Sequence, residues 1–115
     1  MSEPAGIELT PHADKDMKGL WKVSGKVTEH LKVLKTNPLK GHPLSGSLQG
    51  ARALDFTMKG SGQFRAAYFY FPDENVVIIF LVGPHENFYQ MAEKRIKLLK
   101  DLLQKAREAN KTGFI

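Results

Sequence analysis

The hydrophobic residues of this chain change their spacing along its length, and that spacing predicts where strands and helices form. Residues 52–59 alternate, with Leu54, Phe56 and Met58 on one side and polar or charged residues between them. A period of two is typical of a strand that has one face in water. We therefore expect the first long strand of a sheet here.

Two further strands follow in the sequence. Residues 63–71 are rich in aromatic side chains, and residues 76–82 are an uninterrupted apolar run. The length of that run, its β-branched content and its bounding turns favour a central strand that is covered on both faces. Turns at 60–62 and 72–75, where Gly, Ser, Pro, Asp and Asn gather, join the three strands into an antiparallel sheet.

Helical spacing dominates the N-terminal part of the chain. After a short candidate strand at 7–9, Thr10 and Pro11 form a typical helix start, with Thr at the N-cap and Pro at the first helical position. The apolar stripe of this first helix is Ala13, Met17, Leu20 and Trp21. A second helix is expected over about 26–35, and a Pro- and Gly-rich loop follows at 38–50.

The C-terminal part predicts one long helix from about 86 to 109. Its apolar residues recur at spacings of three and four, as Tyr89, Ala92, Ile96, Leu99, Leu103 and Ala106. The stripe is narrow and longer than a small sheet usually covers. Its distal half therefore packs either on a partner chain, as a homo- or hetero-oligomer, or across its own domain.

These elements predict one α+β domain over residues 1–115. We expect an N-terminal helical hairpin packed on a small antiparallel β-sheet, followed by a long C-terminal helix.

Composition narrows the class of partner. The chain has 17 Lys and Arg against 12 Asp and Glu, a net charge of +5, which suits a polyanion such as nucleic acid.

The chain has no cysteine, no apolar run long enough to span a bilayer and no signal-peptide pattern, so we expect a cytoplasmic protein without a membrane partner. No His, Asp and Glu set has metal-ligand spacing, and no phosphate-binding Gly-rich loop is present.

A segment with polar and titratable side chains, residues 83–89, follows the central strand directly. If the protein has an active site, we expect it there. His85 is the only residue of this cluster that titrates near neutral pH, so it suits proton transfer, although a surface histidine in a turn often has no role. Tyr89 either stacks on a base or acts as a general acid, or it packs in the core as the start of the apolar stripe of the helix. Arg65 either holds a phosphate or is a wet-face charge paired with Asp55.

Other charged residues fit nucleic-acid contacts less specifically. Arg52, Lys59 and Lys40 either contact phosphates or are ordinary solvated charges. His12, His30 and His42 have no partners at informative spacing, and we interpret them as incidental.

The order of these elements, with an arginine-bearing strand and a Gly-x-x turn into the last helix, resembles the RelE/ParE toxin superfamily of bacterial toxin–antitoxin modules. The matching segments are Leu34-Lys35-Thr36-Asn37-Pro38, Pro43-Leu44-Ser45-Gly46, Arg52-Ala53-Leu54, Phe64-Arg65-Ala66-Ala67-Tyr68 and Val82-Gly83-Pro84-His85-Glu86-Asn87-Phe88-Tyr89. The resemblance covers roughly residues 7–98.

In the RNA-cleaving branch, the resemblance places functional residues at Arg52, Arg65, His85 and Tyr89. His85 stands where many relatives have arginine, and Leu54 stands where some ribosome-dependent members have a second lysine. The implied partners are a cognate antitoxin protein, the ribosome and mRNA.

Three functions remain open at this point. The first is a toxin that cleaves mRNA on the ribosome without a metal or cofactor, with Arg65, His85 and Tyr89 as catalytic residues and Arg52, Lys59 and Lys40 as RNA contacts. The second is a ParE-like toxin that inhibits DNA gyrase by binding, without nuclease chemistry. The third is a toxin homologue that acts only as a binding module.

Overall fold

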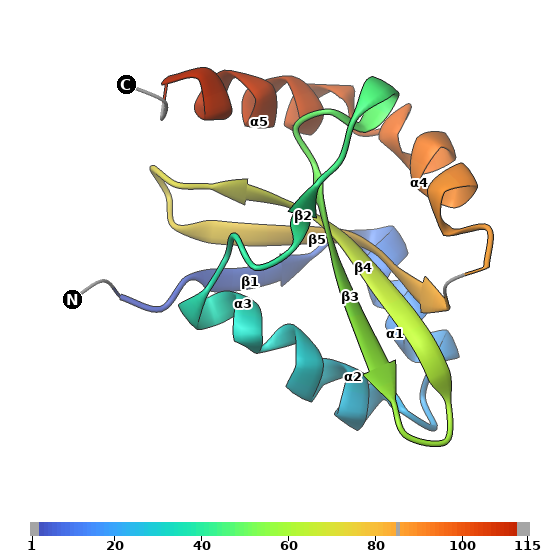
Figure 1. Cartoon of the computed structure of the whole chain (residues 1–115). Coiled ribbons are helices and arrows are strands. Elements are labelled where there is room, and N and C mark those ends of the chain that lie inside the picture. Colours follow the sequence, from blue (N-terminus) through green and yellow to red (C-terminus); the bar gives the residue numbers. More distant parts are fainter. Residues whose placement is uncertain (1–2, 85, 113–115) are drawn as a thin grey trace.

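One mixed β-sheet organises the protein, and helices cover both of its faces (Figure 1). The computed structural model describes residues 3–84 and 86–112. Within these residues the strands are β1 (Gly6–Leu9), β2 (His42–Pro43), β3 (Arg52–Met58), β4 (Gly62–Phe71) and β5 (Val76–Pro84). The helices are α1 (Pro11–Gly19), α2 (Ser24–Leu31), α3 (Val33–Thr36), the short 3-10 helix η1 (Gly46–Leu48), α4 (Phe88–Ile96) and α5 (Lys100–Thr112).

The strand order is β1-β5-β4-β3-β2, so β5 lies inside the sheet, as its apolar sequence predicts. The pairs β2–β3, β3–β4 and β4–β5 are antiparallel. The prediction of a purely antiparallel sheet is wrong at one edge, because β1 pairs with β5 in parallel, with Ile7 opposite Val77. The N-terminal segment thereby covers an edge of β5 that the antiparallel hairpins leave unpaired.

A bulge lies in β5, where the register against β4 skips one residue. Ala67 pairs with Leu81 but Tyr68 pairs with Ile79, so Phe80 is the extra residue. Phe80 and Leu81 consequently both pack in the same core, on the side of the sheet that α4 and α5 cover.

The β5 edge beyond β1 is closed by an ion pair between the two helical layers. Asp16 of α1 and Arg95 of α4 form a two-point contact, and only 14% and 16% of their side chains are exposed. Asp16 also accepts a hydrogen bond from the Val82 backbone N–H, and Arg95 donates one to the Phe80 carbonyl. The pair therefore satisfies backbone groups that the bulged edge leaves without strand partners.

The two faces of the sheet carry separate cores. On one face the helices α1, α2 and α3 supply Ala13, Val27, Leu31 and Leu34. On the other face the helices η1, α4 and α5 supply Leu48, Phe88, Ala92, Ile96, Leu103 and Ala106. Figure 1 shows the α1–α3 layer below the sheet and the α4–α5 layer above it.

The N-terminal helices match the prediction in part. The Thr10 hydroxyl caps α1 by accepting from the Ala13 N–H at 3.2 Å, and Pro11 is its first residue. The segment expected as one second helix is divided at Lys32 into α2 and α3. Trp21 lies beyond the end of α1 and is 70% exposed, so its assignment to the inward stripe is wrong.

The single C-terminal helix is also wrong, because the chain breaks it at residues 97–99. There the N–H groups of Leu98 and Leu99 bond to carbonyls three residues back, which tightens the turn and ends α4. The break lets α4 pack against β5 and η1 while α5 returns over β4. Leu103 and Ala106 are buried in the chain's own core, so the distal stripe covers its own domain.

No helix in the described ranges is both long and apolar enough to cross a membrane.

Candidate functional site

An arginine and a carboxylate from neighbouring strands form the centre of the candidate site. Arg65 of β4 lies opposite Asp55 of β3, and their side chains share the face that α4 covers. The Arg65 Nε–H donates to Asp55 Oδ1 at 2.5 Å. Only 19% of the Arg65 side chain is exposed, against 51% for Asp55. In the described part of the chain, the two terminal nitrogens of Arg65 have no hydrogen-bond partner.

Tyr89, in the first turn of α4, contacts this arginine. Asn87 adopts a left-handed conformation with φ of 55°, which turns the chain into the helix. The Arg65 guanidinium carbon lies 4.9 Å from the centre of the Tyr89 ring, a cation–π distance. The ring is half-buried and meets the Phe88 ring edge-on.

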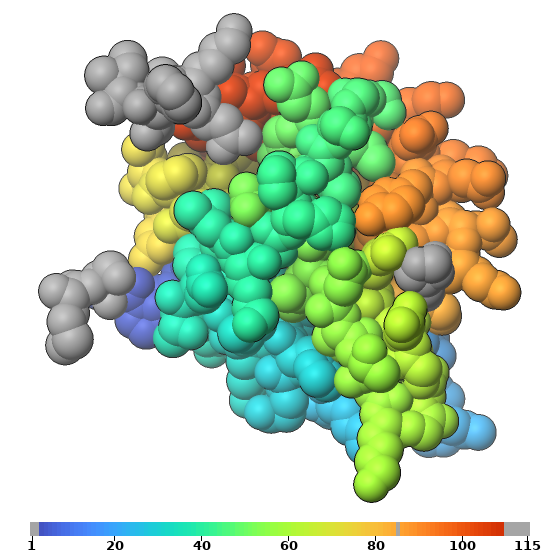
Figure 2. Space-filling view, viewed as in Figure 1, coloured from blue at the N-terminus to red at the C-terminus, as the bar shows by residue number. Residues whose placement is uncertain are grey.

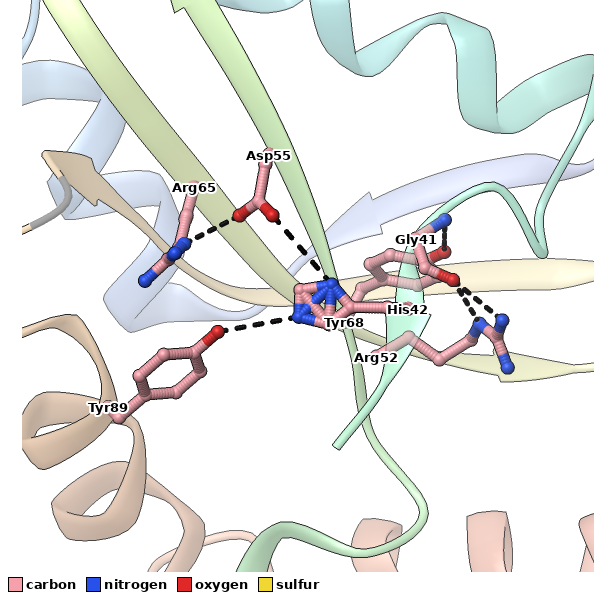
Figure 3. Close-up of polar contacts among 7 residues, drawn as sticks. All are labelled: Gly41, His42, Arg52, Asp55, Arg65, Tyr68 and Tyr89. Atoms are coloured by element: carbon pink, nitrogen blue, oxygen red, sulfur yellow. Dashed lines mark hydrogen bonds and ion pairs between the residues drawn. The ribbon is translucent and has the colours of Figure 1, made fainter. Parts of the chain in front are cut away.

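His42 connects the tyrosine with the carboxylate. Its Nε2 lies 3.4 Å from the Tyr89 hydroxyl, and its Nδ1 lies 3.7 Å from Asp55 Oδ2. Figure 3 shows the imidazole between these two groups, with Arg65 on the other side of Asp55. Arg65, Asp55, His42 and Tyr89 thus form one chain of contacts, which we call the Arg65 cluster.

Two side chains, those of Tyr68 and Arg52, hold the backbone next to His42 by hydrogen bonds. The buried Tyr68 hydroxyl accepts from the Gly41 N–H at 3.0 Å and donates to the Pro38 carbonyl at 2.7 Å. Arg52 donates through Nε and Nη2 to the Gly41 carbonyl. A Cβ at residue 41 would lie 2.7 Å from the Tyr68 hydroxyl oxygen, so only glycine fits there.

The burial of Tyr68 and its anchoring contacts act on its pKa in opposite directions, and burial has the larger effect. Burial raises the pKa of the Tyr68 hydroxyl above its ordinary value of 10.0, while the Gly41 hydrogen bond and the charge of Arg52 act in the opposite direction. The phenol therefore remains protonated and able to donate to Pro38 in the folded protein.

Two hollows flank the Arg65 cluster. One has a volume of about 320 Å³ and is lined by residues that include Asp55 and Arg65. The other has a volume of about 390 Å³ and lies between α4 and residues 42–48. His42 and Tyr89 line this second hollow. In Figure 2 the green segment of residues 43–50 abuts the orange segment of α4 on this face.

The structure brings together two of the three catalytic candidates from the sequence, Arg65 and Tyr89. The third, His85, lies outside the described residues. The alternative that pairs Arg65 with Asp55 is confirmed. Because this pair uses Nε alone, the terminal nitrogens of Arg65 are left for a phosphate, and that role stays a prediction.

The predicted RNA contacts are spread apart. Arg52 is on the opposite face from Arg65, and its guanidinium binds the carbonyls of Leu39 and Gly41. Lys59 is exposed in the turn between β3 and β4, and Lys40 is exposed next to Gly41. RNA binding by these three residues stays a prediction.

His42 is the member of the cluster that sequence reasoning missed. The interpretation that His42 lacks partners is wrong, because the two-residue strand β2 pairs it with Ala53 and so places it beside Asp55. A strand this short leaves no periodic signal in the sequence. Within the described residues, no group of three His, Asp or Glu side chains gathers in a way that could hold a metal ion.

Solved structures of toxins share this fold. The chain superposes on a protein from the RelBE2 toxin–antitoxin complex of Mycobacterium tuberculosis with a TM-score of 0.65 and 23% identity, over 74% of this chain and 95% of that one. It superposes on a mutant of the E. coli toxin RelE in the free state with a TM-score of 0.61 and 22% identity, over 81% and 98%. For isolated E. coli RelE the TM-score is 0.54 at 23% identity, over 80% and 98%.

No curated protein sequence matches the chain. Residues 7–93 match the model of one protein family, described as the ParE-like toxin of type II bacterial toxin–antitoxin systems. This match covers most of the chain, including every member of the Arg65 cluster, and it agrees with the resemblance seen in the sequence. The chain therefore belongs to the ParE-like toxins of type II bacterial toxin–antitoxin systems.

Proposed function

We propose that this toxin is an mRNA endonuclease that cleaves its substrate at the Arg65 cluster. The observation that supports this most directly is the convergence of a guanidinium, a phenol and an imidazole on one surface. RNA can be cut without an external nucleophile when its own 2′-hydroxyl attacks the adjacent phosphorus. That reaction needs a proton acceptor, a cation for the phosphorane and a donor for the leaving 5′-oxygen.

Arg65 meets the demand for a cation. Asp55 holds its Nε, so the guanidinium is oriented before substrate arrives. The two terminal nitrogens are then left to present a planar fork to phosphate oxygens. Asp55 also places a negative charge beside the arginine. The phosphate therefore binds the outer edge of the guanidinium and not the edge that Asp55 occupies.

His42 and Tyr89 suit the proton transfers. In the neutral imidazole, Nε2 can accept a proton from the 2′-hydroxyl, directly or through the Tyr89 hydroxyl. Asp55, 3.7 Å from Nδ1, then stabilises the imidazolium that forms. Contacts of 3.4 to 3.7 Å are long, as catalytic contacts often are before substrate binds. His85, which follows Pro84 in the sequence, is the proposed donor to the 5′-oxygen.

The proposed partners follow from the family. A type II toxin is held inactive by a cognate antitoxin protein, and two of the similar solved structures are toxin–antitoxin complexes. The net charge of +5 favours an acidic partner and RNA alike. We propose that the substrate is mRNA on the ribosome.

The second candidate function is the one that the ParE side of the resemblance implies, inhibition of DNA gyrase by binding, and the matching family model is described as ParE-like. Such a toxin would need the fold but would not need the Arg65 cluster to act on a phosphate.

The test is inducible expression with growth curves and primer extension on a reporter mRNA. The wild-type protein should arrest growth and cut the reporter within codons. Arg65→Ala should reduce cleavage by about 100-fold or more, the loss usual for a preorganised charge donor. The matched control is Arg107→Ala, which removes an arginine that binds the Gln49 carbonyl away from the cluster. Growth arrest with intact mRNA and loss of plasmid supercoiling would support the gyrase function instead.

A further inference from the structure

The hollow between α4 and residues 42–48, which we call the α4 pocket, has a chemistry that differs from that of the Arg65 cluster beside it. Its volume of about 390 Å³ is within the range of small-ligand sites. Pro43, Leu44 and Leu48 give it apolar walls, and the Tyr89 ring gives it an aromatic one. Such walls suit a flat, weakly polar group such as a nucleobase.

Glu93 places a carboxylate at this pocket. Tyr89 and Glu93 are four residues apart on α4, so both side chains point from the same face of the helix. In the described part of the chain, the Glu93 carboxylate has no hydrogen-bond or ion-pair partner. None of the described residues that line the pocket is Lys or Arg. The pocket therefore disfavours a phosphate and favours a neutral ligand that donates hydrogen bonds.

Among the RNA bases, guanine fits this demand best. A carboxylate can only accept hydrogen bonds, and the guanine edge presents two adjacent donors, N1–H and the N2 amino group. Adenine and cytosine each present one amino group beside a ring-nitrogen acceptor, which would face the second carboxylate oxygen. Uracil presents one N–H between two carbonyl acceptors.

The position of the pocket connects it with the proposed chemistry. His42 and Tyr89 line the pocket and also belong to the Arg65 cluster. An RNA whose phosphate lies on Arg65 therefore has a neighbouring base within reach of the pocket. We propose that the α4 pocket binds a guanine next to the cut, read by Glu93, as the specificity subsite of the nuclease; this rests on the proposed function.

The first arm of the test maps 5′ ends across cellular RNA after induction. Wild-type cuts should be enriched for guanine at one fixed position beside the cut. In Glu93→Gln, which keeps the size of the side chain but adds a donor, this enrichment should fall by about 10-fold or more while cutting continues. Glu29→Gln, on α2 and paired with Lys32, is the matched control and should keep the wild-type pattern. Unbiased cuts, or a bias unchanged in Glu93→Gln, would overturn the proposal.

The second arm does not depend on cleavage. Guanosine, adenosine, cytidine and uridine are titrated separately into the isotope-labelled protein, and amide shifts of α4 are followed by NMR. Guanosine should shift these signals at lower concentration than the other three nucleosides, and Glu93→Gln should remove the difference. Selective guanosine binding without RNA cleavage would sustain the pocket and refute the nuclease. Equal shifts from all four nucleosides would refute the pocket, whether or not RNA is cut.

Discussion

Removing the Tyr68 hydroxyl tests whether the anchoring of Gly41 positions His42. Tyr68→Phe deletes one hydrogen bond to the Gly41 N–H and one to the Pro38 carbonyl, both made by a side chain that is 0% exposed. A hydrogen bond contributes about 0.5–1.5 kcal/mol, and a buried N–H left without a partner costs about 1–3 kcal/mol. We expect the free energy of unfolding to fall by about 2–4 kcal/mol in total.

Tyr70→Phe is a matched control on the same strand. It removes one hydrogen bond, from the half-buried Tyr70 hydroxyl to Asn75 Oδ1, and should cost about 1 kcal/mol. Since 1 kcal/mol corresponds to about 4 °C in a domain of this size, Tm should fall by roughly 8–16 °C in Tyr68→Phe and by about 4 °C in Tyr70→Phe.

The assays are thermal unfolding by circular dichroism and RNA cleavage, the latter measured well below both values of Tm. Cleavage by Tyr68→Phe should be about 10- to 100-fold slower, because His42 loses its fixed backbone and small misplacements of a catalytic group are costly. Tyr70→Phe should cleave at the wild-type rate. If Tyr68→Phe loses stability but cleaves normally, the anchoring does not position His42 and the reasoning fails.

Three further predictions concern the stability of the fold and of the loop that holds His42. The free energy of unfolding should fall as pH rises above 10, because the unfolded chain releases the Tyr68 proton there while the folded chain, with its raised pKa, still holds it; urea unfolding across this range should show a smaller loss in Tyr68→Phe. Asp16→Ala should lower the free energy of unfolding by about 3–5 kcal/mol, since it leaves Arg95 largely buried without its counter-charge; a urea midpoint equal to the wild-type value would contradict this. Gly41→Ala should reduce cleavage at least as much as Tyr68→Phe, because its Cβ would lie 2.6 Å from the Ala53 carbonyl oxygen; an unchanged rate and Tm would show that the loop accommodates a side chain.

The strands were predictable because their signals are local. The alternation in β3 indicates one buried face, and the apolar run in β5 indicates two. The structure confirms both strands, with β5 inside the sheet. The parallel pairing of β1 was not predictable, since four residues carry no information on direction. The break between α4 and α5 was hidden too, because residues 97–99 contain no Gly or Pro and the apolar spacing continues through them.

Only part of the candidate site was predictable from the sequence. Arg65 and Tyr89 stood out because their motifs resemble those of a known family, and the structure places their side chains in contact. His42 did not stand out, because its position beside Asp55 depends on a pairing between a two-residue strand and β3. Glu93 did not stand out in the sequence at all, and only the pocket beside it distinguishes it from the other charged residues of α4.

The most direct test of the central claim is the chemistry of the cut ends. Purified toxin is incubated with mRNA in translating ribosomes, and the product termini are analysed by ligation and phosphatase sensitivity, with Arg65→Ala as the inactive comparison. Attack by the 2′-hydroxyl at the Arg65 cluster predicts a 2′,3′-cyclic phosphate on one fragment and a free 5′-hydroxyl on the other, both reduced by about 100-fold or more with Arg65→Ala. Cut ends that carry a 5′-phosphate, or mRNA that stays intact with the wild-type toxin, would contradict the account.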